Sequence, residues 1–227
     1  MAYEDFTTYT EVDTQGFLSQ TASKATFTAL GRRVAVAYLY SDKGAAHFAG
    51  DFEHLLTAYV SASDTYGSCA FHLLGNELGD MGQVSASATG KGVAIRWYEN
   101  AGAKAYRLSE IVGSSTLYSD DYAHADNVGN VRYIKFKRVE SVGTYGTLYA
   151  YIYSDAEMTS LLDTLSLALH SKEDYRYCYV TSGHYVNGSP DYFCTGYVEN
   201  LDLQEAAAPT QKVYTSMASK MIAAGLL

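Results

Sequence analysis

Two neighbouring runs decide the fold class: Val131-Arg-Tyr-Ile-Lys-Phe-Lys-Arg-Val139 and Thr147-Leu-Tyr-Ala-Tyr-Ile-Tyr153. Both runs are rich in β-branched and aromatic residues, and apolar side chains recur in them at every second position. Between them lies Gly143-Thr-Tyr-Gly146, whose glycines favour a tight reversal of the chain. The two runs therefore predict a pair of antiparallel strands.

The same signals recur along most of the chain. Short runs with apolar alternation are separated by clusters of Gly, Ser, Asn and Asp, which are typical of turns. Many short strands separated by turns favour a β-sandwich or barrel over alternating strands and helices. Further strands are expected at 34–39, 52–60, 69–74, 93–99, 105–108, 174–181 and 192–203.

One internal stretch departs from the strand pattern. Ser154-Asp-Ala-Glu157 has the spacing of a capping box, which satisfies the first free N–H groups of a helix. Met158, Leu161 and Leu162 follow at helical spacing. We therefore expect a short helix near 155–162 that runs into a strand near 164–169.

The C-terminal segment differs from the rest. Residues 205–209 have the composition of a linker, and Thr210 is a candidate N-cap for a helix that stops at Gly225. A helix of about 15 residues is marginal alone in water, so its apolar stripe needs a surface. The two candidate surfaces for this stripe are the sandwich of the same chain and a neighbouring subunit. We predict one domain over 1–204 and a linker with a docking helix over 205–227. The predicted assembly contacts are Val213, Tyr214, Met217, Met221 and Ile222.

Composition limits the function classes. The chain has 227 residues and a formal net charge of −9, from 16 Lys and Arg against 25 Asp and Glu. This balance argues against a general nucleic-acid binder, which needs surplus cations to displace counterions. No apolar run approaches the roughly 18 residues that span a bilayer, and the first residues lack the features of a secretory signal. We expect a protein that is made in a cytoplasm and inserts into no membrane.

The three cysteines leave two interpretations open. An odd number of cysteines without a secretory signal favours free thiols. However, Cys178 and Cys194 flank a turn-rich segment over 183–190, and a hairpin there would place them opposite each other. A disulfide between these two is the alternative to free thiols.

Several phrases are similar to those of one family, in order along residues 3–204. They include Tyr40-Ser-Asp-Lys-Gly44, His47-Phe-Ala-Gly-Asp-Phe-Glu53 and Thr195-Gly-Tyr-Val-Glu-Asn-Leu-Asp-Leu203. In these phrases the chain resembles the concanavalin A-like lectin and glucanase superfamily, specifically the LamG-like jelly rolls of phage and metagenomic structural proteins. The resemblance implies an all-β, antiparallel jelly-roll sandwich, to which the short internal helix and the C-terminal helical tail are added.

Tyrosine is unusually frequent, with 22 residues. An exposed Tyr ring can lie against the apolar side of a sugar while its hydroxyl meets water. For Trp97, packing in the core is the alternative to a sugar platform, and Asn187-Gly188 is equally a turn dipeptide. The predicted glycan contacts are Trp97, Tyr98, His184, Tyr185, Asn187 and Tyr192.

A catalytic carboxylate pair is not expected. The glucanases of the superfamily resemble one another in a Glu-x-Asp-x-(x)-Glu strand motif, which supplies a nucleophile and a proton donor on one face. This chain has only Glu11-Val-Asp13, without the second Glu. A hydrolase or lyase with an unfamiliar carboxylate pair is the alternative to a protein that is not an enzyme.

An acidic loop is a candidate cation site. Calcium takes six to eight oxygen ligands, and the loop 119–129 is rich in them. A solvated acidic turn is the other interpretation, because Asp and Asn also stabilise local bends. Calcium is the one cofactor that the sequence suggests. Its predicted ligands are Asp120, Asp121, Asp126 and Asn127.

Together, these observations lead to a functional hypothesis. The resemblance implies a non-enzymatic surface protein of a phage virion, either a head decoration or a tail-associated domain, with a lectin-like jelly roll that contacts glycans. The expected partners are capsid or tail proteins, further copies of this chain and a cell-surface glycan. The alternative from a different class is a free carbohydrate-binding lectin module.

Overall fold

Fourteen strands and two short helices make up the described chain. The computed structural model describes residues 3–32, 36–124, 127–184 and 192–205. The helices are η1 (Phe6–Thr8, a 3-10 helix) and α1 (Met81–Ala86). The strands are β1 (Thr10–Asp13), β2 (Leu18–Gln20), β3 (Lys24–Arg32), β4 (Ala37–Asp42), β5 (Phe52–Ser63), β6 (Ser68–Gly75), β7 (Lys91–Asn100), β8 (Ala103–Val112), β9 (Ser115–Ala123), β10 (Val131–Val139), β11 (Thr147–Tyr153), β12 (Leu161–Ala168), β13 (Tyr177–Ser182) and β14 (Tyr192–Asp202).

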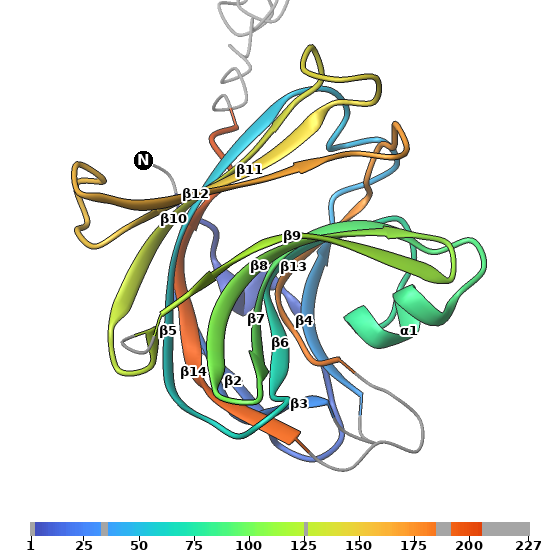
Figure 1. Ribbon diagram of the computed structural model, residues 1–227. Coiled ribbons are helices and arrows are strands. Elements are labelled where there is room, and N and C mark those ends of the chain that lie inside the picture. Colours follow the sequence, from blue (N-terminus) through green and yellow to red (C-terminus); the bar gives the residue numbers. More distant parts are fainter. Residues whose placement is uncertain (1–2, 33–35, 125–126, 185–191, 206–227) are drawn as a thin grey trace, which may run out of the picture.

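The strands form two stacked antiparallel sheets (Figure 1). Sheet A is seven-stranded, in the order β1-β4-β13-β6-β7-β8-β9. Sheet B is also seven-stranded, in the order β12-β11-β10-β5-β14-β3-β2. The predicted all-β sandwich is thus confirmed.

The pair of runs that predicts the fold class is confirmed in detail. Strand β10 is antiparallel to β11, with Ile134 opposite Ile152 and Phe136 opposite Ala150. These four side chains are buried in the core between the sheets, whereas the alternate residue Lys135 lies on the outer face of sheet B. Alternation along a strand sends successive side chains to opposite faces of a sheet, which is why one run serves both the core and the surface.

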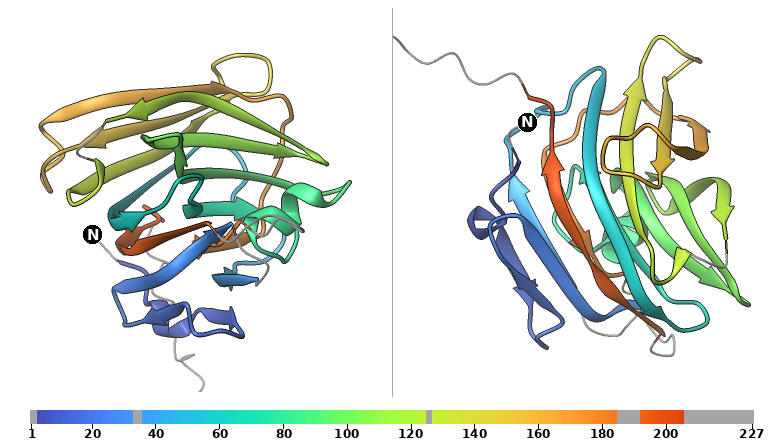
Figure 2. Two further views of the ribbon diagram at one scale, coloured as in Figure 1. Left: turned by 60° about the horizontal axis from the view of Figure 1, so that its bottom comes forward. Right: turned by 90° about the vertical axis from the view of Figure 1, so that its left-hand side faces the viewer.

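The last two strands lie in the middle of different sheets. β13 lies between β4 and β6 in sheet A, and β14 lies between β3 and β5 in sheet B. The right-hand view of Figure 2 shows β14, in orange, flanked by β3 and β5. Segments far apart in the sequence therefore pair at the centre of both sheets.

A second, smaller apolar cluster covers part of the outer face of sheet A. Met81 and Val84 of α1 pack there against Ala70, Leu73 and Ala94. Asp80 caps this helix in a capping box with Gln83, so the free N–H groups of the first turn are satisfied. Figure 1 shows α1 on the side of sheet A that points away from sheet B.

The predicted helix near 155–162 is wrong. The Asp155 carboxylate accepts hydrogen bonds from the backbone N–H groups of Thr159, at 2.8 Å, and Ser160, at 2.9 Å. These bonds close a turn between β11 and β12, and Leu161 then opens β12 opposite Tyr153. The side chain thus caps a turn, and the leucines extend a strand. The predicted strand near 164–169 lies within or beside β12, and the short helix of the fold is α1.

The predicted C-terminal helix lies outside the described residues, as do its assembly contacts Val213, Tyr214, Met217, Met221 and Ile222. The last described strand ends at Asp202, close to the predicted boundary at 204, and the division into domains stays a prediction. No helix in the described part of the chain is long and apolar enough to span a bilayer.

The hairpin that would join Cys178 to Cys194 does not form, because β13 and β14 belong to different sheets. Cys178 Sγ instead lies 3.5 Å from the Tyr9 hydroxyl, and Cys194 Sγ lies 2.8 Å from Cys69 Sγ. All three cysteines are buried and free. Burial raises the pKa of the Cys194 thiol well above its usual value, so the thiolate that attacks a disulfide is scarce in the folded state.

This geometry predicts which disulfide forms on oxidative refolding. With oxidised glutathione as the oxidant, the two thiols of Cys69 and Cys194 lose two protons and two electrons to give one disulfide and two molecules of reduced glutathione. Peptide mapping by mass spectrometry should find the Cys69–Cys194 bond in refolded protein, and little of it when the native protein is treated. The C178S variant should keep the bond and C69S should lose it. A Cys178–Cys194 bond would contradict the register of the two sheets.

Candidate functional site

A cluster of arginine and tyrosine side chains lies on the outer face of sheet A, next to the second apolar cluster. It consists of Arg96, Tyr98, Arg107, Tyr118 and Asp121, and is called here the arginine–tyrosine cluster. On β7, Ile95 and Trp97 enter the core, so Arg96 and Tyr98 between and beside them face outward. The register places Arg96 directly opposite Arg107 of β8.

The rings and guanidinium groups of the cluster are interleaved. The Arg107 guanidinium carbon lies 4.3 Å from the ring centroid of Tyr98 and 5.0 Å from that of Tyr118. The Arg96 guanidinium carbon lies 5.3 Å from both centroids. These distances are those of cation–π contacts. The Tyr118 side of the cluster is open to solvent, because Tyr118 is 43% exposed.

Only one of the two guanidinium groups has a carboxylate partner in the described chain. Asp121 binds Arg107 through two parallel hydrogen bonds, from Nε to Oδ1 and, at 2.6 Å, from Nη2 to Oδ2. This bidentate pair raises the pKa of Arg107 above its usual value. Two like charges directly opposite each other on neighbouring strands repel, and the single carboxylate neutralises only one of them.

Arg96 is the buried and unneutralised member of the cluster. Its residue is 2% exposed, its Nη2 donates to Ser68 Oγ at 2.7 Å, and its Nε has no hydrogen-bond partner. In the part of the chain that the structure describes, no carboxylate forms an ion pair with Arg96. Burial is the main cause that lowers the pKa of this guanidinium. A buried cation without a counter-ion is costly, and an anionic ligand would supply the missing charge.

Trp97 is not a sugar platform. Its side chain is fully buried in the core, where the ring meets Tyr106 edge to face and the indole N–H donates to Ser63 Oγ at 2.9 Å. The prediction of a glycan contact at Trp97 is therefore wrong, because strand alternation turns this residue inward. The alternative interpretation, in which Trp97 packs in the core, is confirmed.

The other predicted glycan contacts do not converge. Tyr98 belongs to the arginine–tyrosine cluster, whereas Tyr192 is on β14 in sheet B, where its ring meets Tyr66. The His184 backbone N–H donates to the carbonyl of Gly31 at 3.0 Å. Tyr185 and Asn187 lie outside the described residues.

Two of the predicted calcium ligands have other partners in the structure. Asp120 and Asp121 are neighbours on β9, where the pairing with β8 is irregular, and Asp121 binds Arg107. Asn127 is buried, and its amide donates to the carbonyls of Lys104 and Tyr122. Asp126 lies outside the described residues, and within those that are described no three His, Cys, Asp or Glu side chains are grouped to hold a metal ion. The predicted calcium site, and calcium binding itself, stay predictions.

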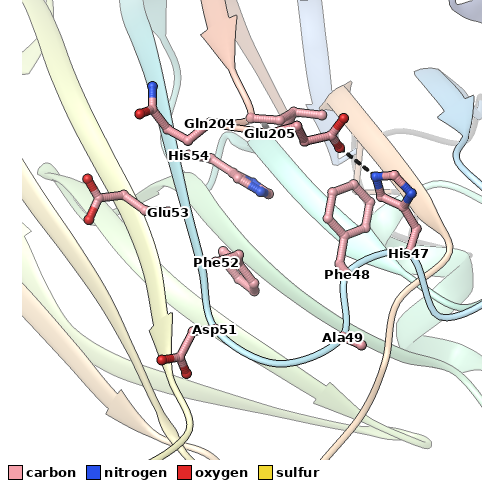
Figure 3. A pocket seen from close by; sticks show the side chains of 10 residues that line it. His47, Phe48, Ala49, Asp51, Phe52, Glu53, His54, Gln204 and Glu205 are labelled. Carbon is pink, nitrogen blue, oxygen red and sulfur yellow. Dashed lines mark hydrogen bonds and ion pairs between the residues drawn. The ribbon is translucent and has the colours of Figure 1, made fainter. Parts of the chain in front are cut away.

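A pocket of about 520 Å³ lies at one end of the sandwich (Figure 3). Its walls come from the connection before β5, from the first residues of β5 and from the residues that follow β14. His47 and Glu205 meet across it, with Nε2 and Oε1 2.5 Å apart. The sequence does not mark this pocket, because its two sides are more than a hundred residues apart. The lining residues are His47, Phe48, Ala49, Asp51, Phe52, Glu53, His54, Leu203, Gln204 and Glu205.

A pair of buried histidines connects this pocket to the core. His54 Nδ1 lies 2.9 Å from His72 Nε2, and His72 Nδ1 lies 2.9 Å from the carbonyl oxygen of Tyr179. Burial lowers the pKa of His54 well below its usual value, and the neighbouring His72, His47, Lys43 and Arg138 lower it further. Burial also lowers the pKa of His72, to about 4.

The histidine pair predicts a loss of stability in mild acid. Because the folded-state pKa of each histidine is below the unfolded value of 6.5, the unfolded chain binds more protons as the pH falls. The stability is fully present above pH 6.5 and decreases toward pH 4, by about 3 kcal/mol from His72 alone. Urea unfolding at a series of pH values measures this slope. H72Q should flatten it, whereas H124Q at an exposed position should leave it unchanged, and equal slopes in all three proteins would contradict the assignment.

Comparisons with known proteins agree on the architecture. No family model matches the chain, and no curated protein matches it by sequence. Among solved structures, a legume lectin-like domain from Entamoeba histolytica aligns with a TM-score of 0.57 at 12% identity, over 88% of this chain and 90% of that one. The alginate lyase Aly36B, in complex with alginate trisaccharide, aligns with a TM-score of 0.56 at 14% identity, over 89% and 90% of the two chains. The lumenal domain of VIP36, bound to Ca²⁺ and Man3GlcNAc, aligns with a TM-score of 0.50 at 12% identity, over 88% and 86%. The fold is therefore a concanavalin A-like jelly roll, which lectins and lyases share.

Proposed function

We propose that this chain is a lectin-like carbohydrate-binding domain that recognises a carboxylate-bearing glycan at the arginine–tyrosine cluster. The observation that carries the proposal is the buried guanidinium of Arg96, which faces outward between two tyrosine rings and has no carboxylate partner in the described chain. A ligand carboxylate would supply the counter-ion that sheet A itself does not.

The chemistry of the cluster suits an acidic sugar. Guanidinium groups bind carboxylates through charge-assisted, often bidentate hydrogen bonds, which select a planar anion over a neutral hydroxyl. The rings of Tyr98 and Tyr118 lie beside this cation. An aromatic ring of this kind offers an apolar surface to the C–H groups of a pyranose, and its hydroxyl offers a hydrogen bond to a sugar O–H group. Such a shallow site binds weakly in one copy, so several copies would act together.

A polysaccharide lyase is the second candidate, and a specific observation favours it. The same cluster combines a cation that neutralises a uronate carboxylate with tyrosine hydroxyls that could exchange a proton. In such an elimination a base removes the proton next to the carboxylate, the glycosidic C–O bond breaks, a C=C double bond forms, and the departing glycosidic oxygen takes a proton from an acid such as a tyrosine hydroxyl. One of the structural neighbours is an alginate lyase. We favour binding without cleavage, as the sequence pattern predicts.

The place of the domain on a phage virion remains part of the proposal. It rests on the family resemblance of the sequence, and it assigns the segment beyond Glu205 to assembly with capsid or tail proteins or with further copies of this chain. In this arrangement the arginine–tyrosine cluster is the surface presented to a cell-surface glycan.

Binding of acidic oligosaccharides tests the proposed site. A glycan array, followed by calorimetry with an oligouronate and a neutral oligoglucose of the same length, should show selective binding of the acidic ligand. The R96M variant keeps an apolar stem of similar length but removes the buried charge, so its melting temperature should be unchanged or higher while affinity falls at least about tenfold. K137M, on the outer face of sheet B, is the control with the same change in net charge. An R96M protein that melts far lower and still binds would show that Arg96 is structural.

Product analysis separates the two candidate functions. Incubation with polyuronates should produce no rise in the ultraviolet absorbance of unsaturated uronates. A rise that the Y98F or Y118F variant abolishes would assign a lyase to the cluster and overturn the non-enzymatic function.

Removal of the last 19 residues tests the assembly role. We expect a chain ending at residue 208 to melt cooperatively, as the full chain does, but to remain monomeric and to be absent from purified particles. Size-exclusion chromatography with light scattering and mass spectrometry of particles measure both properties. A truncated chain that loses its cooperative melt would show that the segment completes the sandwich itself.

A further inference from the structure

Hydrogen bonding fixes the tautomers of the buried histidine pair. The carbonyl oxygen of Tyr179 only accepts, so the Nδ1 atom of His72 carries the proton that is donated to it. Because burial keeps both imidazoles neutral, His72 Nε2 is then an acceptor, and His54 Nδ1 is its donor. A neutral imidazole has one N–H group, and His54 Nε2 is therefore left with a lone pair.

This lone pair belongs to the pocket of Figure 3. His54 lines the pocket although its residue is only 1% exposed, and its Nε2 atom has no hydrogen-bond partner in the described chain yet is not sealed off by protein atoms. Phe52 stacks on the imidazole with centroids 4.7 Å apart, and Phe48 meets it edge to face at 5.5 Å. The ring is thus held in one orientation by two aromatic contacts and the hydrogen bond to His72.

The other lining residues include three acids and two phenylalanines. In Figure 3 the Glu205 carboxylate faces His47, the carboxylates of Asp51 and Glu53 point away from the imidazole of His54, and Phe48 and Phe52 supply the aromatic faces. Lys135 and Lys137 neutralise Glu53 from outside, and His47 contacts Glu205 at the rim. Two cations act on His54 from nearby, Lys43 and Arg138. Lys43 pairs with Glu4, and the three nitrogen atoms of Arg138 donate to the backbone carbonyls of Phe48, Gly50 and Glu173.

We propose that this pocket binds a small organic amine, whose ammonium group donates a hydrogen bond to His54 Nε2 and whose apolar body lies between Phe48 and Phe52. An ammonium group carries only hydrogen-bond donors, so it matches an imidazole lone pair in a pocket that also holds the Glu205 carboxylate, and the aromatic faces favour a cation through their quadrupoles. A carboxylate or phosphate would meet the lone pair of His54 and the carboxylate of Glu205 and is rejected by these two acceptors. The volume of about 520 Å³ is in the range of small-molecule sites.

Three probes of one shape test the charge preference: benzylamine, benzyl alcohol and benzoate. Nuclear magnetic resonance of the full-length protein, labelled with ¹⁵N in the histidine rings, should show His54 in the free protein with a protonated Nδ1 and an unprotonated Nε2. Benzylamine should shift the Nε2 resonance in a saturable manner, benzyl alcohol should bind at least about tenfold more weakly, and benzoate should not bind. A protonated Nε2 in the free protein, or benzoate binding as well as benzylamine, would overturn the proposal.

Variants separate this pocket from the arginine–tyrosine cluster. H54F should reduce benzylamine affinity at least about tenfold, and H124Q and R96M should leave it unchanged. Because H54F also removes the partner of His72 and could impair folding, E205Q at the rim is the second variant, with an expected several-fold loss of benzylamine affinity and unchanged melting. Benzylamine affinity that neither H54F nor E205Q alters would show that the amine binds elsewhere.

Discussion

Side-chain alternation along β7 is the constraint on which both the core and the proposed site depend. Trp97 is fully buried between the sheets, and the residues on either side of it, Arg96 and Tyr98, must then lie on the outer face. A shift of one residue in this strand would expose the indole and bury two polar groups in the core, and the register is strongly specified for that reason. The interior of the sandwich thus fixes the side of sheet A on which Arg96 and Tyr98 lie, and β8 and β9 bring the other members of the arginine–tyrosine cluster beside them.

Both proposed sites contain groups that burial disfavours. Arg96 is a buried cation without a counter-ion in the described chain, and His54 and His72 are imidazoles that must stay neutral. Proteins tolerate such groups where a well-packed core offsets their cost, and they concentrate at sites that bind ligands. Here the large continuous apolar cluster between the sheets, which includes Phe27, Phe71 and Phe136, supplies that stability.

The sequence pattern predicts the class of the fold and fails where pairing is long-range. The strands β10 and β11 follow from local alternation, whereas β3 and β9 are missed because their apolar pattern is weak. Asp155 looks like a helix cap in the sequence, and only the strand that begins at Leu161 shows that it closes a turn. The arginine–tyrosine cluster needs the register of β7 with β8, and the pair of His54 and His72 needs the stacking of two sheets. Neither relation is visible in a single sequence. Tyr98 is the one member of the arginine–tyrosine cluster that the sequence analysis names as a glycan contact.

The central positions of β13 and β14 have a consequence for synthesis on the ribosome. Until Tyr177–Ser182 emerges, β4 and β6 lack their shared neighbour, and until Tyr192–Asp202 emerges, β3 and β5 lack theirs. A nascent chain therefore carries unpaired strand edges in the middle of both sheets for almost the whole of translation. The two sheets are completed late, through contacts between residues that are far apart in the sequence. A prematurely terminated chain keeps those edges permanently, which makes truncated products a source of intermolecular strand pairing.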